Sequence, residues 1–540
     1  MGGNINSATF NKKLLYTQTS GNSYVWTGNI YNDTVDYQYT SAVSNGSISF
    51  LNSVANGQFY ISATNRYGFA FGSSSISTNK FTLGANKRVI IGTSGLASGT
   101  YLYFNNIALG DTAAFTLNTS GPIGLGSASF SNSFTNVFTL TSTNPTITNT
   151  TFNKKLTVTK TAGGDVNWTG NTFNDTLDYR FTFSGGATVG FLNSTANANV
   201  YLSNTGTGYL AFGSSTTSTN KFTLAANKRI FVGPAGWTST GTLALQNIQF
   251  NDSANFAISL SNTAAIILGN YTFNTTYNLP ISITNGQISL TKGIFNKKVI
   301  LTKTATAASL SYGGNTFNDT LDIRLQTGDF TTSNSLPDAY NGHIYFSNSS
   351  TGTLNIGRWL GVSSSQAISK KIYIGSAGFA TGNLTFNGFT QLDTTLQSLT
   401  ITGTGSLVIN YSTWHSKLTI DAHLVSITQS VFNRKTAVTA NSIYNISTST
   451  FNKPFKLIKN STTNNDWSAG NTFNDTTEFI IHGGTILFNR WGSSTHNGDL
   501  YVSNTGTGTL ALGSGTYSVT FENNKRIFIG SEGFSTGGYL

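Results

Sequence analysis

The chain has 540 residues, a formal net charge of +11, 57 glycines, no cysteine and only 9% charged residues. So few charges leave too little Glu and Lys for the solvent faces of long amphipathic helices, which argues against all-α and α/β folds. Hydrophobic residues (38%) and aromatic residues (13%) are frequent enough to bury a core, which argues against disorder. The absence of cysteine excludes disulfides and thiolate metal sites. We therefore expect an all-β chain.

Three markers recur in chain order about every 142 residues. A Phe-Asn-Lys motif begins at Phe10, Phe152, Phe295 and Phe451, and an Asn-Asp-Thr motif begins at Asn32, Asn174, Asn318 and Asn474. A basic doublet lies at Lys87-Arg88, Lys228-Arg229, Lys370-Lys371 and Lys525-Arg526, each followed by an apolar triplet and a pair of glycines that we interpret as turn glycines. These spacings predict repeats at 1–151, 152–294, 295–450 (with one extra coil) and 451–540, the last one truncated.

A shorter period of about 22 residues runs inside each repeat, as at Phe250, Phe273, Phe295 and Phe317. Such a period, with short β-rich runs, is typical of one coil of a parallel β-solenoid. We expect a right-handed parallel β-helix of about 25 coils. Each coil would stack one Phe above another in the core and one Asn above another at a turn, where side-chain amides can hydrogen-bond along the ladder. The predicted ladder positions are Phe10, Phe152, Phe295, Phe451, Asn32, Asn174, Asn318 and Asn474.

The same register predicts ion pairs between neighbouring coils. A lysine precedes an aspartate by about one coil in every copy, which gives the pairs Lys12–Asp33, Lys154–Asp175, Lys297–Asp319 and Lys453–Asp475. An exposed pair of this kind contributes about 0.2–1 kcal/mol. We expect its larger effect to be on register, because a slipped coil would bring like charges together.

Candidate catalytic and metal sites are few. The carboxylate pair Asp33/Asp36 returns as Asp175/Asp178, Asp319/Asp322 and Asp475/Glu478. We favour a structural role for these pairs, with calcium binding as an alternative and catalysis as a weaker one, because a catalytic centre is normally built once. The five histidines show no metal-ligand spacing. We therefore predict no catalytic residue, no cofactor other than the calcium alternative, and no enzymatic activity.

Two recurring features could serve binding. An aromatic residue precedes each Asn-Asp-Thr line, at Trp26, Trp168, Tyr312 and Trp467. It could stack on sugar rings or contact a neighbouring chain, or it could cover the end of a coil. The basic doublets (Lys87, Arg88, Lys228, Arg229, Lys525 and Arg526) could face anionic cell surfaces, or they could lie on a solvated face or form one end of an inter-chain ion pair. The charge is spread too thinly to predict nucleic-acid binding, and no apolar run is long enough to insert in a membrane.

The lines Gly170-Asn-Thr-Phe-Asn-Asp-Thr176 and Tyr201-Leu-Ser-Asn-Thr-Gly-Thr-Gly208 resemble the long Asn/Thr/Gly-rich surface proteins of Bacteroidota. These proteins are exported by the type IX secretion route and include gliding adhesins and the hook-bearing filaments of predatory marine species. The resemblance implies export and display at the cell surface, for an internal fragment of a longer chain. It transfers no functional residue.

These observations predict a structural and adhesive element of a long extracellular filament that associates with copies of itself. Glycans on a target cell are the second expected partner. The main alternative is a β-helix protein that binds or cleaves polysaccharide, which would gather carboxylates and basic residues in one cleft. Ice binding through Thr-x-Thr arrays such as Thr157/Thr159 and Thr400/Thr402 is a weaker alternative, because the arrays do not continue from coil to coil.

Overall fold

The computed structural model describes residues 3–540 except 239, 261–262, 333–334, 358–362, 380, 462–465, 489–492, 513–516, 536 and 538. Every regular element within this described part is a β-strand, and neighbouring strands pair in parallel, as β2 and β5 (Leu14–Gln18 and Val35–Tyr39) do. The predicted all-β parallel solenoid is thereby confirmed, and its right-handed winding stays a prediction. No helix in the described residues is long and apolar enough to cross a bilayer.

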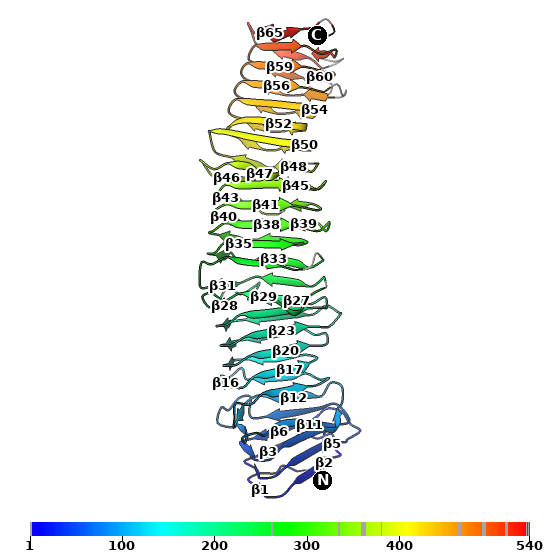
Figure 1. Ribbon diagram of the computed structural model, residues 1–540, viewed down its shortest axis with the longest axis vertical. Helices are drawn as coiled ribbons and strands as arrows, with labels where there is room; N and C mark the ends of the chain where they lie inside the picture. Colours follow the sequence, from blue (N-terminus) through cyan, green and yellow to red (C-terminus); the bar gives the residue numbers. More distant parts are fainter. Residues whose placement is uncertain are drawn as a thin grey trace. The chain divides into compact units, whose positions relative to one another are not determined.

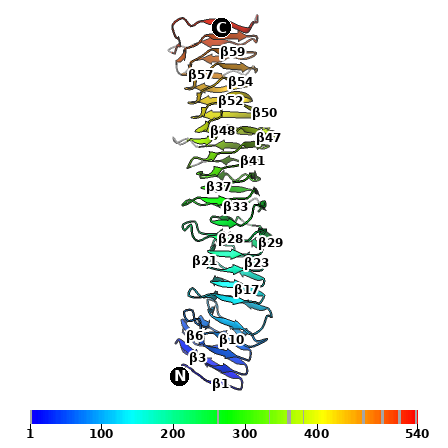
Figure 2. The ribbon, with the colours of Figure 1, turned by 90° about the vertical axis from the view of Figure 1, so that its left-hand side faces the viewer.

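The chain divides into two compact units. The first comprises residues 1–254 and 263–266, and the second comprises residues 255–262 and 267–540. The predicted repeat 152–294 therefore contributes to both units. Within each unit the strands lie one above another in successive coils, as two views at right angles show (Figures 1 and 2).

Each coil of the first unit supplies one strand to each of three stacks of strands, which we call sheets. Strand n pairs with strand n+3, except that the first sheet is interrupted between β13 and β16 and the second between β11 and β14. The first sheet consists of β1 (Thr9–Phe10), β4 (Ile30–Tyr31), β7 (Ser53–Ala55), β10 (Phe81–Leu83) and β13 (Ile107–Leu109), followed by β16 (Asn132–Phe134), β19 (Thr150–Phe152), β22 (Thr172–Phe173), β25 (Ser194–Ala196), β28 (Phe222–Leu224) and β31 (Ile248–Phe250). The second consists of β2, β5, β8 (Phe59–Ala63) and β11 (Val89–Leu96), followed by β14 (Phe115–Asn118), β17 (Phe138–Ser142), β20 (Leu156–Lys160), β23 (Leu177–Phe181), β26 (Val200–Asn204) and β29 (Ile230–Trp237). The third consists of β3 (Tyr24–Thr27), β6 (Gly46–Leu51), β9 (Tyr67–Phe71), β12 (Tyr101–Phe104), β15 (Ile123–Gly126), β18 (Thr146–Thr148), β21 (Val166–Thr169), β24 (Thr188–Leu192), β27 (Tyr209–Phe212) and β30 (Thr242–Leu245).

The second unit continues the same three-strand coil. Its first sheet consists of β34 (Thr275–Tyr277), β37 (Gly293–Phe295), β40 (Thr316–Phe317), β43 (Ala339–Tyr340), β46 (Ser364–Gln366), β49 (Phe389–Gln391), β51 (Thr413–Trp414), β53 (Val431–Phe432), β55 (Thr450–Phe451), β58 (Thr472–Phe473), β61 (Ser494–His496) and β64 (Val519–Phe521). Its second sheet begins with β32 (Phe256–Ser259), β35 (Ile281–Asn285), β38 (Val299–Lys303), β41 (Leu321–Leu325), β44 (Ile344–Asn348) and β47 (Ile372–Phe379). The strand β33 (Ala265–Gly269) has residues in both units, and β36 (Gln287–Thr291), β39 (Ser309–Leu310), β42 (Phe330–Thr331), β45 (Thr353–Ile356) and β48 (Asn383–Asn387) follow as third-sheet strands.

Three long strands bridge two sheets of the second unit. They are β50 (Leu396–Asn410), β52 (Lys417–Thr428) and β54 (Thr436–Ser447). The pairing of β50 with β52 shifts register between Ile401 and Ser406, so each half of the long strand keeps its own partners. After β54 the coil again has separate strands, namely β56 (Phe455–Lys459), β59 (Thr477–Ile481), β62 (Leu500–Asn504) and β65 (Ile527–Phe534) in the second sheet and β57 (Asp466–Ala469), β60 (Ile486–Phe488) and β63 (Leu510–Leu512) in the third.

The aromatic ladder fills the core beside the first sheet. Phe152 stacks on Phe173, Phe295 stacks on Phe317 at 5.0 Å between ring centroids, and Phe451 stacks on Phe473 at 5.2 Å. Phe10 stacks on Tyr31 in the same way. His496 continues the column between Phe473 and Phe521, where its ring is 1% exposed. At these rungs the sequence period of about 22 residues translates directly into core packing. The predicted member Phe273 was wrong: Tyr277 stacks on Phe295 in its place, because the strand β34 ends at Tyr277 and Phe273 precedes it.

The asparagine ladder lies at the turn between the first and second sheets. The side-chain amide of Asn174 donates to Asn153 and accepts from Asn197, both at 2.7 Å. The remaining predicted members make equivalent bonds to the coils before and after them: Asn32 with Asn11 and Asn56, Asn318 with Asn296 and Asn341, and Asn474 with Asn452 and Asn497. Each amide thus satisfies a neighbouring amide, and the turns of successive coils are held in one register.

The corner between the third and first sheets places a residue in the left-handed region in many coils. Asn52, Asn149 and Asn193 have φ values of 47°, 46° and 45°, and Gly126 has a φ of 87°. A Cβ on Gly126 would lie 1.9 Å from the carbonyl oxygen of Thr148. Glycine and asparagine suit these corners because they adopt positive φ at low cost.

A bulged strand of eight residues closes the second-sheet run in each repeat, at β11, β29, β47 and β65. The pairing of β29 with β26 shifts register between Leu202 and Asn204, and the other three shift at the matching place. The glycine pairs that follow the basic doublets lie inside these strands. Our interpretation of them as turn glycines was therefore wrong: the second glycine of each pair, with φ of 75° at Gly236, provides the bulge.

Candidate functional site

Two of the recurring tryptophans, Trp26 and Trp168, lie in the core. Trp26 and Trp168 point into the core with no exposed area, and the indole Nε1 of Trp168 donates to the carbonyl of Pro145 at 2.8 Å. Tyr312 is half-buried, and the side chain of Trp467 lies outside the described part of the structure. The prediction that Trp26 and Trp168 contact glycans or other chains was wrong, because both occupy inward-facing positions of third-sheet strands.

The predicted lysine–aspartate contacts are replaced by local bonds. Among the ion pairs of the described residues, none within 4.0 Å joins Lys12 to Asp33, Lys154 to Asp175, Lys297 to Asp319 or Lys453 to Asp475. Each of these aspartates instead accepts a hydrogen bond from the next backbone N–H, as Asp33 does from Thr34 at 2.6 Å. That bond is the main cause of the lowered pKa of Asp33, and Lys12 adds a smaller electrostatic contribution. The register placed these side chains level, but turn geometry gave the carboxylate a nearer donor.

Two arginines of the basic doublets form ion pairs within the chain. Arg88 and Arg229 make bidentate pairs with Asp111 and Asp252, with shortest distances of 2.8 and 2.6 Å. The Arg229 guanidinium holds the pKa of Asp252 at about 2, and the Arg88 guanidinium lowers that of Asp111 as well. The interpretation of Arg88 and Arg229 as outward contacts was therefore wrong. Lys87 and Lys228 are half-buried, whereas Lys525 and Arg526 are exposed.

The two members of each carboxylate pair go to different places. Asp175 stays at the turn, whereas Asp178 lies on β23, where Arg180 binds it at 2.7 Å and Lys155 approaches to 3.9 Å. Glu478 is paired with Lys456 at 3.0 Å in the same way. No group of three or more His, Asp or Glu side chains that could hold a metal ion occurs among the described residues. The calcium alternative stays a prediction without a described site.

An outward-facing column of second-sheet residues is the feature that sequence reasoning missed. In repeat 3, Asp322 pairs in register with Tyr345 and then with Tyr373, and the two tyrosine rings stack at 4.8 Å and 19°. The parallel column beside it runs from Arg324 to Ser347 and on to Gly375. Tyr373 is 37% exposed. Large aromatic side chains on an outer face are unusual and mark a surface worth examining.

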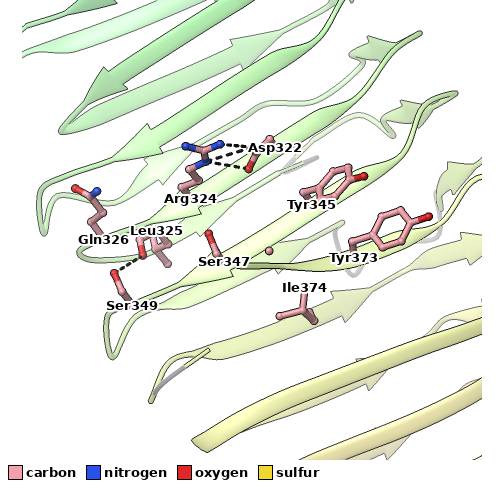
Figure 3. A pocket seen from close by; sticks show the side chains of 10 residues that line it. Asp322, Arg324, Leu325, Gln326, Tyr345, Ser347, Ser349, Tyr373 and Ile374 are labelled. Atoms are coloured by element: carbon pink, nitrogen blue, oxygen red, sulfur yellow. Dashed lines mark hydrogen bonds and ion pairs between the residues drawn. The ribbon is translucent and has the colours of Figure 1, made fainter. Parts of the chain in front are cut away.

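These two columns enclose a trough of about 590 Å³, which we call the repeat-3 trough (Figure 3). Tyr345 and Tyr373 form one wall. The small residues Ser347 and Gly375 line the space beside this wall and fill little of it. Arg324 lies at one end, with its Nε and Nη2 bonded to Asp322 at 3.2 and 2.7 Å. That bond raises the pKa of Arg324, so the guanidinium stays charged. The opposite side is formed by Gln326 and Ser349.

The equivalent residues of repeat 2 keep the same register, with Asp178 and Ser203 buried, and we call this arrangement the repeat-2 trough. Tyr201 stacks on Phe231 at 5.5 Å, and Asp178 precedes Tyr201 in the register. Its small column is Ser203 and Gly233, where a Cβ on Gly233 would lie 2.5 Å from the Ser203 hydroxyl.

Repeats 1 and 4 depart from this set. In repeat 1, Gln38 stands in place of the arginine and Ile90 in place of the second aromatic ring. In repeat 4, the aromatic pair Tyr501–Phe528 is kept, but Ile480 occupies the arginine position. Two local signals in the sequence could have identified the troughs. One is an Asp-x-Arg pair on one strand, and the other is an aromatic residue two positions before the first glycine of the pair that follows a basic doublet.

The comparisons with known proteins give no relative: no protein-family model, no curated protein and no solved structure matches this chain.

Proposed function

We propose that the chain is a structural and adhesive element of a long extracellular filament at the cell surface, and that it associates with copies of itself. The observation that carries this proposal is the repetition of two ladders, one of stacked aromatic rings and one of bonded asparagine amides, through the repeats. Both ladders resist sliding of one coil over the next, and a chain of this kind extends by adding coils. Export by the type IX route is part of the proposal and rests on the family resemblance.

Self-association would use exposed cationic positions. Contacts between exposed charges are screened by salt, with a Debye length of about 10 Å at 0.1 M. Sedimentation of the chain should therefore show association that weakens as the salt concentration rises.

The decisive experiment is electron cryo-microscopy of the protein as its own cells display or shed it. The proposal expects filaments with several parallel chains in cross-section and a repeat of about 4.8 Å along the axis. Separate single chains that never assemble, on cells or in the medium, would contradict the filament proposal.

A second candidate function, polysaccharide binding, is favoured by one specific observation. The repeat-3 trough combines a half-buried tyrosine stacked on an exposed one with an Asp322–Arg324 pair, which are the apolar and polar elements that small-molecule sites typically combine. This observation supports adhesion through glycans and leaves polysaccharide cleavage without a described group of residues in its favour.

A further inference from the structure

We propose that the repeat-2 trough and the repeat-3 trough bind neutral hexose polysaccharide. This inference rests on the adhesive half of the proposed function and names the ligand class and the residues. It replaces the buried tryptophans, which the sequence had suggested as glycan contacts, with a different set of side chains.

The trough is more than a pair of stacked rings. Stacking of Tyr345 on Tyr373 would stabilise the fold by itself. It would not require the neighbouring column to be small. Yet serine and glycine lie beside the aromatic pair in both troughs, as Ser347 and Gly375 in one and as Ser203 and Gly233 in the other. In repeat 3 the result is about 590 Å³ of open space next to an apolar wall.

The charge in the repeat-3 trough favours a neutral ligand, whereas Lys155 adds a further positive charge 3.9 Å from Asp178 in the repeat-2 trough. Asp322 and Arg324 neutralise each other at 2.7 Å, so the polar end has no net charge. An acidic sugar would have to compete with Asp322 for the guanidinium, whereas a hydroxyl can accept from Arg324 and donate to Asp322 at the same time. Nη1 of Arg324 has no acceptor among the described residues, and the side chain is 49% exposed, so a donor remains available.

A pyranose presents an apolar face of C–H groups and a rim of hydroxyls. The tyrosine wall matches the face, and the ion pair, Ser347 and Ser349 match the rim. Each site is shallow and should bind weakly by itself. Sites that recur along one chain, and again in each copy of a filament, convert weak contacts into strong adhesion to a polymer.

The test is isothermal titration calorimetry of the full chain with cellohexaose, laminarihexaose and mannohexaose, with hexagalacturonate as the acidic comparison. We expect at least one neutral hexasaccharide to bind at two equivalents per chain, because two repeats carry the complete set. Tyr373→Ala should leave one equivalent, and Tyr373→Ala combined with Phe231→Ala should leave none. Arg324→Gln, which copies the glutamine of repeat 1, should weaken its site by at least about ten-fold.

Phe528→Ala is the matched control. It removes an exposed ring from the aromatic pair of repeat 4, where no arginine is present, and should leave binding unchanged. Circular dichroism of every variant checks folding, since all substituted side chains lie on the outer face. The proposal is overturned if no neutral hexasaccharide binds, if only hexagalacturonate binds, or if the double variant binds as well as the parent chain.

The two proposals fail separately. Electron microscopy of the double variant should show unchanged filaments with sugar binding lost. Filaments without sugar binding in the parent chain would refute this inference and leave the structural function standing. Sugar binding by chains that never assemble would refute the filament and leave the troughs as glycan sites.

Discussion

Replacing His496 with Phe should remove a specific sensitivity of the fold to acid. His496 occupies a rung of the aromatic ladder between Phe473 and Phe521, and burial lowers its pKa from 6.5 to about 4. Its Nδ1 has no hydrogen-bond partner among the described residues. The imidazole ring is therefore neutral in the folded chain. Protonation of His496 favours opening of the stack, which exposes the charged ring to water.

The pH dependence of the free energy of unfolding follows from the difference in the pKa of His496 between the folded and unfolded chain. Between about pH 6.5 and pH 4 the unfolded chain binds more protons at His496 than the folded chain does. Protonation of this residue therefore leaves the free energy of unfolding unchanged above pH 6.5 and lowers it as the pH falls below that value. A pKa difference of this size corresponds to about 3 kcal/mol in total. About 2 kcal/mol of it is lost between about pH 7 and pH 5. Phenylalanine fits the stack and does not titrate.

The assay is hydrogen exchange read by mass spectrometry for peptides covering β58, β61 and β64, corrected for the intrinsic exchange rate at each pH. The parent chain should lose protection in this segment on going from about pH 7 to pH 5, by a factor of about 30. His496→Phe should lose much less. His423→Phe, at a half-buried position outside the ladder, is the control and should behave as the parent does. Equal acid sensitivity of the parent and His496→Phe would refute the reasoning.

Three further substitutions test the core and the turns. Asn174→Ala removes two side-chain hydrogen bonds of the asparagine ladder and should lower the free energy of unfolding by about 1 kcal/mol, measured as a lower denaturant midpoint. An unchanged midpoint would show that hydrogen bonds to water compensate for the lost ladder bonds. Gln391→Leu removes a fully buried amide with no described partner, and heat denaturation should show a gain of about 1–3 kcal/mol; a loss would indicate a hidden partner. Burial lowers the pKa of Lys160 to about 8, so stability should rise with pH between about 8 and 10.5, because in this range the unfolded chain holds a proton that the folded chain has released. Lys160→Met should reduce that rise, and an unchanged rise would contradict the role of this lysine.

Much of the architecture follows from spacing alone. The period of about 22 residues predicted that Phe295 stacks on Phe317 and which Asn bonds to which, because in a parallel solenoid a fixed coil length brings equivalent residues into register. The pair Phe295–Phe317 and the pair Asn174–Asn153 show this directly. The period was wrong at Phe273, since Tyr277 occupies the rung next to Phe295 and Phe273 lies outside the strand. The all-β class followed from composition, since a chain with 9% charged residues cannot cover long helices.

The sequence by itself determined the repeats, the coil and the two ladders, and only the tertiary structure decided which side chains face outward and which partner each charge takes. Trp168 and Tyr345 both recur as aromatic positions, yet one is buried and the other lines a trough. The reason is that side chains alternate between two faces, so the conformation of each corner sets whether a position points in or out. Spacing placed Lys154 level with Asp175, but the turn gave that aspartate the nearer N–H of Thr176. The spacing of residues along the chain determines the register of the coils. The direction of each side chain and the partner of each charge depend on backbone angles, which the sequence period does not specify.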